Sequence, residues 1–287
     1  MIERILITVM TYPTLSDKHF ETVCTAGFRM DGSWVRIYPV PHRMLSLNGQ
    51  PMYHKWQVIE VDLEKSPSDN RPESYRIHNI DTLKIHGKID ANRPDWELRM
   101  SWLKKGKEIY DDMSKILERT YYEADRISLA VLRPTEITGF DVEAEGNLGD
   151  YNLKLQNVRN RYKAEEMQLS LFGDNDAEKS SFEFARKIPY KFFYRFKTND
   201  GKERRLMIED WEIGMLYLHC LKGASPEVAI DKVREKYTGF ITKNEVYLLL
   251  GTQYKWQNKK APNPYVIIGV VAAPKGVGNS LYLPLDY

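Results

Sequence analysis

The sequence contains only two cysteines and no apolar run long enough to span a membrane. Cys24 and Cys220 lie far apart in apolar surroundings, which predicts free thiols in a reduced compartment rather than a disulfide framework. The first ten residues, MIERILITVM, combine one early arginine with a short apolar run, a pattern that is unlike a signal peptide. We therefore expect a cytoplasmic protein that has no membrane partner.

Common catalytic and cofactor motifs are also missing. The six histidines are not closely paired, and the chain has no CxxC, HExxH, GxxxxGK[ST] or GxSxG sequence. The glycine-rich run at residues 274–280 lacks the frame of a phosphate-binding loop and is expected to be an ordinary loop. These absences predict that the protein holds neither a metal nor an organic cofactor.

A large excess of basic charge is absent as well, because the formal net charge is only +2. Dedicated nucleic-acid-binding domains are often far more basic, but a local basic patch is enough for binding. The 287 residues are sufficient for two domains, and 42% hydrophobic with 29% charged residues is a normal soluble balance. Charge and composition therefore leave a nucleic-acid role open without indicating one.

Residues 1–150 are expected to form a β-rich first domain. Strands are predicted at residues 5–9, 22–28, 34–38, 57–63, 128–132 and 136–142, from their apolar or alternating patterns. Asp31-Gly32 is a hairpin signal between two of them. From Asp95 to Tyr122 an apolar stripe at helical spacing predicts one long helix, with Gly106 weakening its middle.

Turn-forming residues then dominate, and residues 151–182 are predicted to be a linker. Residues 183–287 are expected to form a smaller α+β domain. It has strands at 190–197, 205–208, 246–251 and 265–272, and a helix from about Glu209. A second helix is predicted to begin at Ser225-Pro226, where serine caps the end and proline takes the first position. The expected fold class is therefore α+β.

Two groups of acidic residues are candidates for chemistry. Asp210 and Glu212, at a predicted helix start beside Trp211, could activate water or act as general acid and base. The alternative is that they only favour the helix dipole. Glu60, Asp62 and Glu64 share one face of a predicted strand and could hold the metal of a nuclease, but such a face is usually just solvated.

Basic and aromatic residues gather in two places that could contact nucleic acid. The first group could form a platform for phosphates and bases, or it could reflect packing across strands. It comprises Arg29, Trp34, Arg36, Tyr38, His42 and Arg43. The second group lies between two predicted buried strands and could contact the nucleic-acid backbone, or it could be a flexible hairpin tip. It comprises Tyr254, Lys255, Trp256, Lys259 and Lys260.

The run Thr22-Val23-Cys24-Thr25-Ala26-Gly27, followed by Gly32-Ser33-Trp34-Val35-Arg36, resembles a "C-x-x-G … G-x-W-[IV]-R" pattern. That pattern is associated with bacterial proteins that carry paired OB-like barrels near mobile-element or antiviral genes. The resemblance covers about 25 residues and departs where Ile37-Tyr38 precede Pro39. It implies an OB-like barrel in the first domain and a nucleic-acid setting, and it names no reaction.

Gln168-Leu169-Ser170-Leu171-Phe172 resembles the pentapeptide by which bacterial replication and repair proteins bind the DNA sliding clamp. All five positions fit the QL[SD]LF preference of that family. The resemblance implies that the leucines and Phe172 enter apolar pockets of the clamp as a short extended peptide. The alternative is an edge strand, in which alternating apolar residues place Phe172 in the core of this protein.

These expectations combine into one leading hypothesis and two alternatives. The leading hypothesis is a DNA-binding protein recruited through the sliding clamp, which excises or cleaves at modified or unusual bases in phage defence or repair. A base in a duplex must be flipped out for such chemistry, into a pocket with aromatic walls and an acid. The alternatives are a non-catalytic module that binds nucleic acid or protein, and a metal-dependent nuclease.

Overall fold

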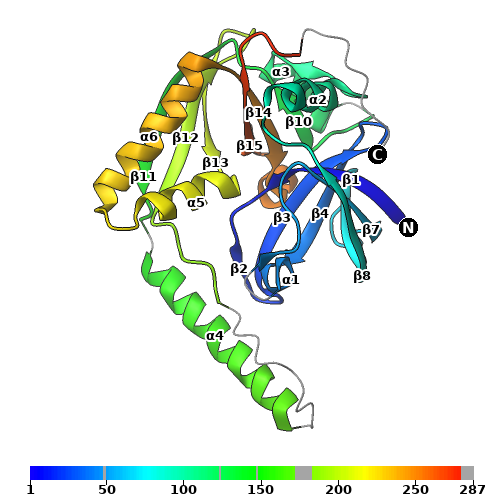
Figure 1. Ribbon diagram of the computed structural model, residues 1–287, viewed down its shortest axis with the longest axis vertical. Coiled ribbons are helices and arrows are strands. Elements are labelled where there is room, and N and C mark those ends of the chain that lie inside the picture. Colours follow the sequence, from blue (N-terminus) through cyan, green and yellow to red (C-terminus); the bar gives the residue numbers. More distant parts are fainter. Residues whose placement is uncertain (48–49, 123, 147, 172–182, 279–287) are drawn as a thin grey trace.

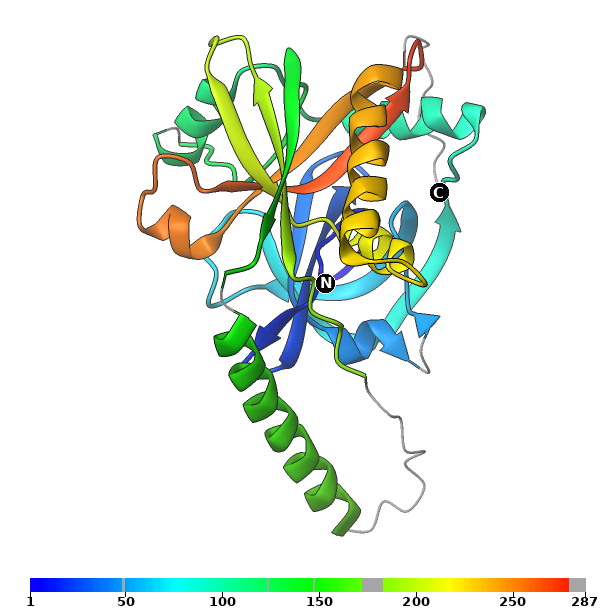
Figure 2. The same cartoon turned by 90° about the vertical axis from the view of Figure 1, so that its left-hand side faces the viewer.

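The computed structural model describes residues 1–47, 50–122, 124–146, 148–171 and 183–278. Most of the strands in this part belong to two sheets, and the helices lie around them, so the expected α+β class is confirmed (Figure 1). Figure 2 shows the same arrangement from the side, with one long helix extending away from the rest. Among the helices in the described part of the chain, none combines the length and apolar character needed to cross a bilayer.

The first sheet closes on itself. Its strands follow the order β1 (Ile2–Met10), β7 (Gln57–Lys65), β8 (Ser74–Lys88), β4 (Trp34–Pro41), β3 (Phe20–Arg29) and β2 (Thr14–Ser16). An additional pairing of β1 with β3 joins five of these strands into a ring. The pairing of β4 with β8 is parallel, whereas the neighbouring pairs are antiparallel.

Gly27 permits this closure. It lies opposite Ile7 in the β1–β3 pairing, and a Cβ added at Gly27 would lie 2.0 Å from the backbone oxygen of Leu6. No side chain can be accommodated at such a distance, so the closing strands require glycine here. The interior of the ring is filled by aliphatic side chains such as Ile5, Val35 and Val61.

The second sheet has seven strands. They follow the order β11 (Glu136–Ala144), β12 (Tyr190–Lys197), β13 (Glu203–Ile208), β15 (Tyr265–Pro274), β14 (Asn244–Thr252), β10 (Leu129–Leu132) and β9 (Ile109–Tyr110). Strands β10 and β11 are consecutive in the chain, on either side of Arg133-Pro134, yet they lie at different places in the sheet. The predicted strands at 128–132, 136–142, 190–197 and 265–272 are all present. The predicted division at residues 150 and 182 stays a prediction, and the two sheets themselves separate between β8 and β9.

The single long helix predicted from Asp95 to Tyr122 is wrong, because two helices and a short strand occupy this segment. They are α2 (Arg93–Lys104), β9 and α3 (Met113–Tyr121). Gly106 follows α2 with φ of +63°, in the left-handed region, and a Cβ there would lie 2.4 Å from the backbone oxygen of Asp31. Asp112 then caps α3 by accepting a hydrogen bond from the Ser114 amide. The apolar stripe at helical spacing was real, but the glycine turn divides it.

The segment predicted as a linker begins instead with a 24-residue helix, α4 (Leu148–Leu171). Its inner part packs on the first sheet: Val158 is buried, and Phe20 contacts Tyr162 edge-to-face. The backbone of residues 168–171 forms the end of α4 rather than an extended peptide, and the structure does not describe the side chains of these four residues. Phe172 lies outside the described residues.

The remaining helices cover one face of the second sheet (Figure 1). The helices on this face are α5 (Trp211–Cys220) and α6 (Pro226–Lys243). Another short helix, α7 (Tyr254–Asn258), joins β14 to β15. As predicted, Ser225 caps α6 and Pro226 takes its first position. The short elements α1 (His42–Leu45), β5 (Ser46–Leu47) and β6 (Gln50–Pro51) follow β4.

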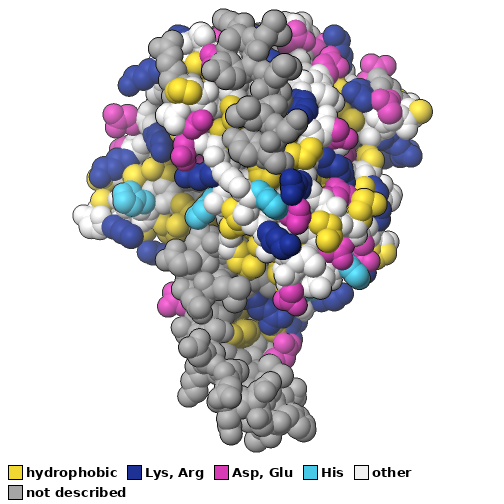
Figure 3. Space-filling view, turned by 45° about the vertical axis from the view of Figure 1, so that its right-hand side comes forward, with side chains coloured by type: hydrophobic (Ala, Val, Ile, Leu, Met, Phe, Trp, Pro, Cys, Tyr) yellow, Lys and Arg dark blue, Asp and Glu magenta, His cyan; other side chains and the backbone are white. Residues whose placement is uncertain are grey.

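A shared apolar cluster joins the two sheets. It includes Leu6 of β1, Phe28 of β3, Trp102 of α2, Leu249 of β14 and Ile268 of β15. Strand β1 is therefore buried on both faces, since its alternate residues fill the ring instead. On the outer face shown in Figure 3, basic and acidic side chains are interspersed and no field of a single sign dominates.

Candidate functional site

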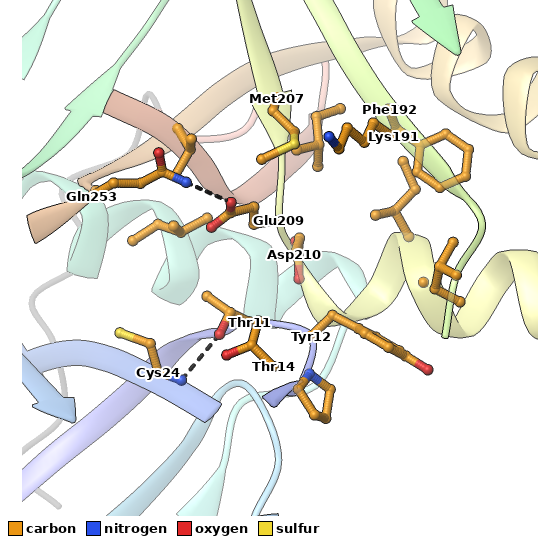
Figure 4. A pocket seen from close by; sticks show the side chains of 18 of the residues that line it. Thr11, Tyr12, Thr14, Cys24, Lys191, Phe192, Met207, Glu209, Asp210 and Gln253 are labelled. Carbon is orange, nitrogen blue, oxygen red and sulfur yellow. Dashed lines mark hydrogen bonds between the residues drawn. The ribbon is translucent and has the colours of Figure 1, made fainter. Parts of the chain in front are cut away.

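A cavity of about 570 Å³ lies between the two sheets. Figure 4 shows side chains from both sheets directed toward it. This volume is within the range of cavities that bind small molecules or single nucleotides. Elements of both sheets contribute to its lining: the segment after β1, strands β3, β4, β12 and β13, and the turn between β14 and β15. The lining residues include Thr11, Tyr12, Cys24, Tyr38, Lys191, Met207, Glu209, Asp210, Gln253 and Tyr254.

Backbone contacts between the sheets place two adjacent acids at this cavity. Thr11, just after β1, forms an antiparallel bridge with Asp210. The amide of Tyr12 donates to the carbonyl of Glu209 at 3.1 Å, and the amide of Glu209 donates to the carbonyl of Ile267 at 2.8 Å. The end of β13 is thereby held between both sheets, and Glu209 and Asp210 both line the cavity.

The Asp210 carboxylate is fully buried and is held by three groups. Lys55, from the loop before β7, donates to its two oxygens at 3.2 and 3.0 Å. The amides of Glu212 and Val270 each donate to it at 3.2 Å, the first of these as the cap of α5. Asp210 therefore links the two sheets as a buried ion pair and a helix cap.

One ammonium serves two carboxylates in this cluster. Lys55 also donates to Glu212 at 2.8 Å, and the Glu212 side chain is 55% exposed. Burial raises the pKa of Asp210 to about 6, against the opposing attraction of Lys55. Partial burial acts in the same direction on Glu212, but Lys55 together with Lys236 and Arg99 lowers the pKa of that carboxyl. The catalytic role predicted for Asp210 and Glu212 stays a prediction, and the structure shows Asp210 already engaged by Lys55 and two amides.

Glu209, which the sequence reasoning missed, is the second carboxylate at the cavity. Its Oε1 accepts a hydrogen bond from Gln253 Nε2 at 2.8 Å (Figure 4). Burial raises the pKa of Glu209, with the Gln253 hydrogen bond opposing this shift. A sequence signal existed, because Glu209 and Asp210 together follow a buried strand, but the sequence could not show that Asp210 meets Lys55 while Glu209 meets Gln253.

The first basic and aromatic group is divided by the structure. Arg36 and Tyr38 line the cavity, and Tyr38 is 37% exposed. Arg36 is buried, and its guanidinium donates to the Ser128 hydroxyl at 2.6 Å and to the Ser128 carbonyl at 3.1 Å. Since Arg36 joins strand β4 to the start of β10, much of its hydrogen-bonding capacity is used within the protein.

The other members of that group lie apart from the cavity lining. Arg29 pairs with Glu3 and donates to the Trp34 carbonyl at 2.9 Å, while Trp34 packs on Phe28 with ring centroids 4.4 Å apart. His42 is buried, with its Nδ1 3.1 Å from Glu21. Arg43 lies over the Phe20 ring. The six residues therefore do not form one exposed platform, and the role predicted for each stays a prediction.

The second basic and aromatic group lies at the edge of the cavity. Tyr254 lines the cavity, and Trp256 is 45% exposed on α7. The ammonium groups of Lys255 and Lys259 lie 5.4 and 5.6 Å from the centre of the Trp256 ring. Lys260 follows with φ of +51°, in the turn that returns the chain toward β15. The predicted loop is thus a short helix that presents an aromatic ring and several ammonium groups.

Further lysines lie on the α4 side of the cavity. Lys154, Lys187 and Lys191 contribute to its lining, together with Glu145. Glu145 is 3.2 Å from Lys187 and 2.9 Å from Lys191, and Lys154 is 3.5 Å from Asp17. Each of these lysines thus has a carboxylate partner, and this side of the cavity carries both signs of charge.

The acids of β7 each have their own basic partners. Glu60 is 2.9 Å from Arg4, Asp62 is 2.7 Å from His78, and Glu64 is 2.7 Å from Arg76. Within the part of the chain that the structure describes, no three His, Cys, Asp or Glu side chains converge as metal ligands. The geometry gives no support to the metal-dependent nuclease.

Two family models match the chain. The model described as "Domain of unknown function (DUF8758)" matches residues 1–105, and the model described as "Domain of unknown function (DUF8757)" matches residues 110–286. The matched ranges meet between α2 and β9, where the chain passes from the first sheet to the second. No curated protein matches the chain.

Among solved structures, one similar chain is described as "Crystal structure of the tetrameric p202 HIN2". It is 9% identical, and the match covers 88% of this chain and 79% of that chain with a TM-score of 0.27. A likeness of this degree carries no argument about ligand or activity.

Proposed function

The chain belongs to the DUF8757 family, and because that membership names no ligand, we propose from the site itself that the protein binds single-stranded nucleic acid in the cavity between its sheets.

The ring of the first sheet has the strand order of an OB-fold. Numbered along the chain, its five strands are β1, β3, β4, β7 and β8, and around the ring they follow the order first, second, third, fifth, fourth. The third and fifth strands are parallel and the fourth closes on the first, as in a five-stranded Greek-key barrel. This order supports the OB-like barrel implied by the resemblance of residues 22–36.

The second sheet has the same order if β10 and β11 are one first strand broken at Arg133-Pro134. The first half of this broken strand, β10, pairs with β14, and the second half, β11, pairs with β12. The order then runs through β12 and β13 to β15 and β14, again with the third and fifth strands parallel. We therefore propose that the chain contains two OB-like barrels.

The position of the cavity carries the proposal. OB-folds bind oligonucleotides on the face of their second and third strands, between the loops that join strands one to two and four to five. In the first barrel these elements contribute the segment at residues 11–15, Cys24, Tyr38 and Arg71, which line the cavity. In the second barrel they contribute Lys187, Lys191, Met207, Gln253 and Tyr254 to the same cavity. Both ligand-binding faces thus meet at one place.

The edge of this cavity has the chemistry that a single strand needs. Lys255 and Lys259 on α7 can neutralise phosphates, while Tyr254 and Trp256 offer rings on which bases can stack. Tyr254 lines the cavity and the other groups lie beside it on α7, and a local patch of this kind is compatible with a DNA role at a net charge of only +2.

Fluorescence anisotropy with labelled single-stranded and duplex oligonucleotides tests this function. We expect single strands to bind more tightly than duplexes, with an affinity that falls as salt rises. The double variant Lys255→Ala, Lys259→Ala should lower the affinity and flatten the salt dependence by about one counterion per lysine. Lys84→Ala, Lys88→Ala on the exposed surface of β8 is the matched control. Equal effects of both double variants would refute binding at the cavity.

Excision or cleavage at unusual bases stays a prediction. If it occurs, Glu209 has a more accessible carboxylate than Asp210, because Lys55 and two amides already engage Asp210. Incubating DNA that contains modified bases with the protein, and then assaying for abasic sites and strand breaks, tests this activity. Equal loss of product in Glu209→Gln and in an exposed control, Glu235→Gln, would exclude Glu209 as the acting group.

We also propose recruitment through the sliding clamp. Helix α4 extends away from both sheets and carries residues 168–171 at its outer end (Figure 2). A motif so placed can bind a partner without blocking the cavity, and tethering raises the local concentration on DNA. Clamp pull-down should fail for Leu171→Ala, Phe172→Ala and persist for Leu153→Ala, an exposed leucine on the same helix. Retention by the double variant would rule out this docking mode.

A further inference from the structure

Glu209 and Gln253 form a hydrogen-bonded pair in the cavity, whose lining also includes apolar, aromatic and basic side chains. The backbone fixes both residues: the Glu209 amide donates to the Ile267 carbonyl at 2.8 Å, and the Gln253 amide donates to the Pro264 carbonyl at 2.9 Å. Their side chains meet through the 2.8 Å bond from Gln253 Nε2 to Glu209 Oε1. Because they come from different loops of the second barrel, the pair is positioned by the fold rather than by local sequence.

The carboxylate of this pair presents hydrogen-bond acceptors to a ligand. An ionised carboxylate can only accept, and each of its oxygens can accept more than one hydrogen bond. Gln253 uses one Nε2 proton on Glu209, so its second Nε2 proton stays a donor and its carbonyl oxygen is a further acceptor. Met207, Val266 and Ile268 lie around the pair in the cavity lining. A polar ligand group in such surroundings must be matched, because an unmatched buried group is strongly unfavourable.

Nucleobases differ in whether an exocyclic group of theirs can donate a hydrogen bond to the Glu209 carboxylate. Cytosine, adenine and guanine carry an exocyclic amino group, and carboxylates accept from such groups in protein–DNA contacts. Thymine and uracil have carbonyl oxygens on both sides of their single ring N–H. A carbonyl oxygen against the Glu209 carboxylate would place two acceptors together with no proton between them.

We infer that the Glu209–Gln253 pair selects bases with an exocyclic amino group and discriminates against thymine and uracil. This inference rests on the proposed binding of single strands in the cavity and adds a specificity to it. Glu209 acts here as a binding residue that reads one edge of a base, while the aromatic rings at the edge of the cavity accept any base by stacking.

The test compares labelled homopolymers of equal length, oligo-dC, oligo-dA and oligo-dT, by fluorescence anisotropy at fixed salt. We expect oligo-dC and oligo-dA to bind roughly tenfold more tightly than oligo-dT, as for one well-formed base contact. Glu209→Gln is close in shape and adds an amide donor that can face a thymine carbonyl, so the ratio should fall toward one. Glu235→Gln, on the exposed side of α6, should keep the wild-type ratio.

The outcomes separate this inference from the function on which it rests. If every homopolymer binds with the same affinity to the wild-type protein, the selection is refuted while binding in the cavity stands. Tighter binding of oligo-dT also refutes the selection. If none of the homopolymers binds, the proposed function itself fails. The wild-type ratio requires no variant, so the test does not depend on whether Glu209→Gln folds.

Discussion

Replacing Lys55 by methionine should destabilise the protein in a pH-dependent way. Lys55 is 9% exposed and lies within 3.2 Å of both oxygens of the buried Asp210. Methionine retains most of the side-chain volume but leaves a buried carboxylate without its cation. Breaking a buried ion pair in this manner reduces the free energy of unfolding by about 3 to 5 kcal/mol. We expect the lower end, about 3 kcal/mol, because the amides of Glu212 and Val270 still donate to Asp210.

The sign of the pH dependence follows from the raised pKa of Asp210. Burial raises this pKa to about 6, so the stability that Asp210 contributes is present at acid pH and is lost as the pH rises through about 6. Lys55 opposes the shift, and its removal therefore moves the folded-state pKa of Asp210 still higher. The difference between Lys55→Met and the wild-type protein should be largest near pH 8 and should shrink toward pH 4.

Urea unfolding followed by circular dichroism at pH 4, 6 and 8 measures this effect. A loss of about 3 kcal/mol corresponds to a midpoint shift of about 1 M urea. Asp210→Asn in the Lys55→Met background should restore part of the stability at pH 8, because it removes the unpaired charge. Lys84→Met, at an exposed lysine, should change the stability by less than about 0.5 kcal/mol. A loss that is equal at all three pH values, or is not relieved by Asp210→Asn, would refute the reasoning.

Three further predictions concern single substitutions. In urea unfolding, Glu209→Gln should be more stable than the wild-type protein at pH 8 and equal to it at pH 4. Burial raises the pKa of Glu209, so the stability that the Glu209 carboxyl contributes at acid pH is lost as the pH rises. Trp256→Ala should weaken single-strand binding roughly tenfold in anisotropy titrations without lowering the melting temperature, since the ring is 45% exposed. Gly27→Ala should lower the free energy of unfolding by at least about 2 kcal/mol, because its Cβ would meet the backbone of Leu6; an unchanged urea midpoint would contradict this account of the closure.

Local sequence signals predicted most of the individual elements correctly. The alternation at residues 57–63 and the aromatic run at 190–197 are strands, and Ser225-Pro226 begins a helix, as expected. These signals succeed because they depend on neighbouring residues alone: alternate side chains fall on opposite faces of a strand, and a serine oxygen reaches an amide three residues ahead.

Predictions failed where a distant segment decides the outcome. Gly106 ends the helical segment partly because Asp31, far away in the chain, lies against it. Helix α4 begins in a segment rich in turn-forming residues, and its inner part packs on Phe20 through Tyr162. The ring closure of the first sheet requires the pairing of β1 with β3, which no local pattern specifies. In each case the tertiary contact overrides a reasonable local preference.

The adjacent acids Glu209 and Asp210 show why a site depends on register as well as on residue type. Successive residues of an extended chain point in opposite directions. The bridge between Thr11 and Asp210 fixes which residue meets Lys55, and the next residue back, Glu209, then reaches Gln253 at the cavity. A shift of one residue would exchange the two environments. The same backbone contacts that join the two sheets thus place Asp210 against Lys55 and Glu209 against Gln253.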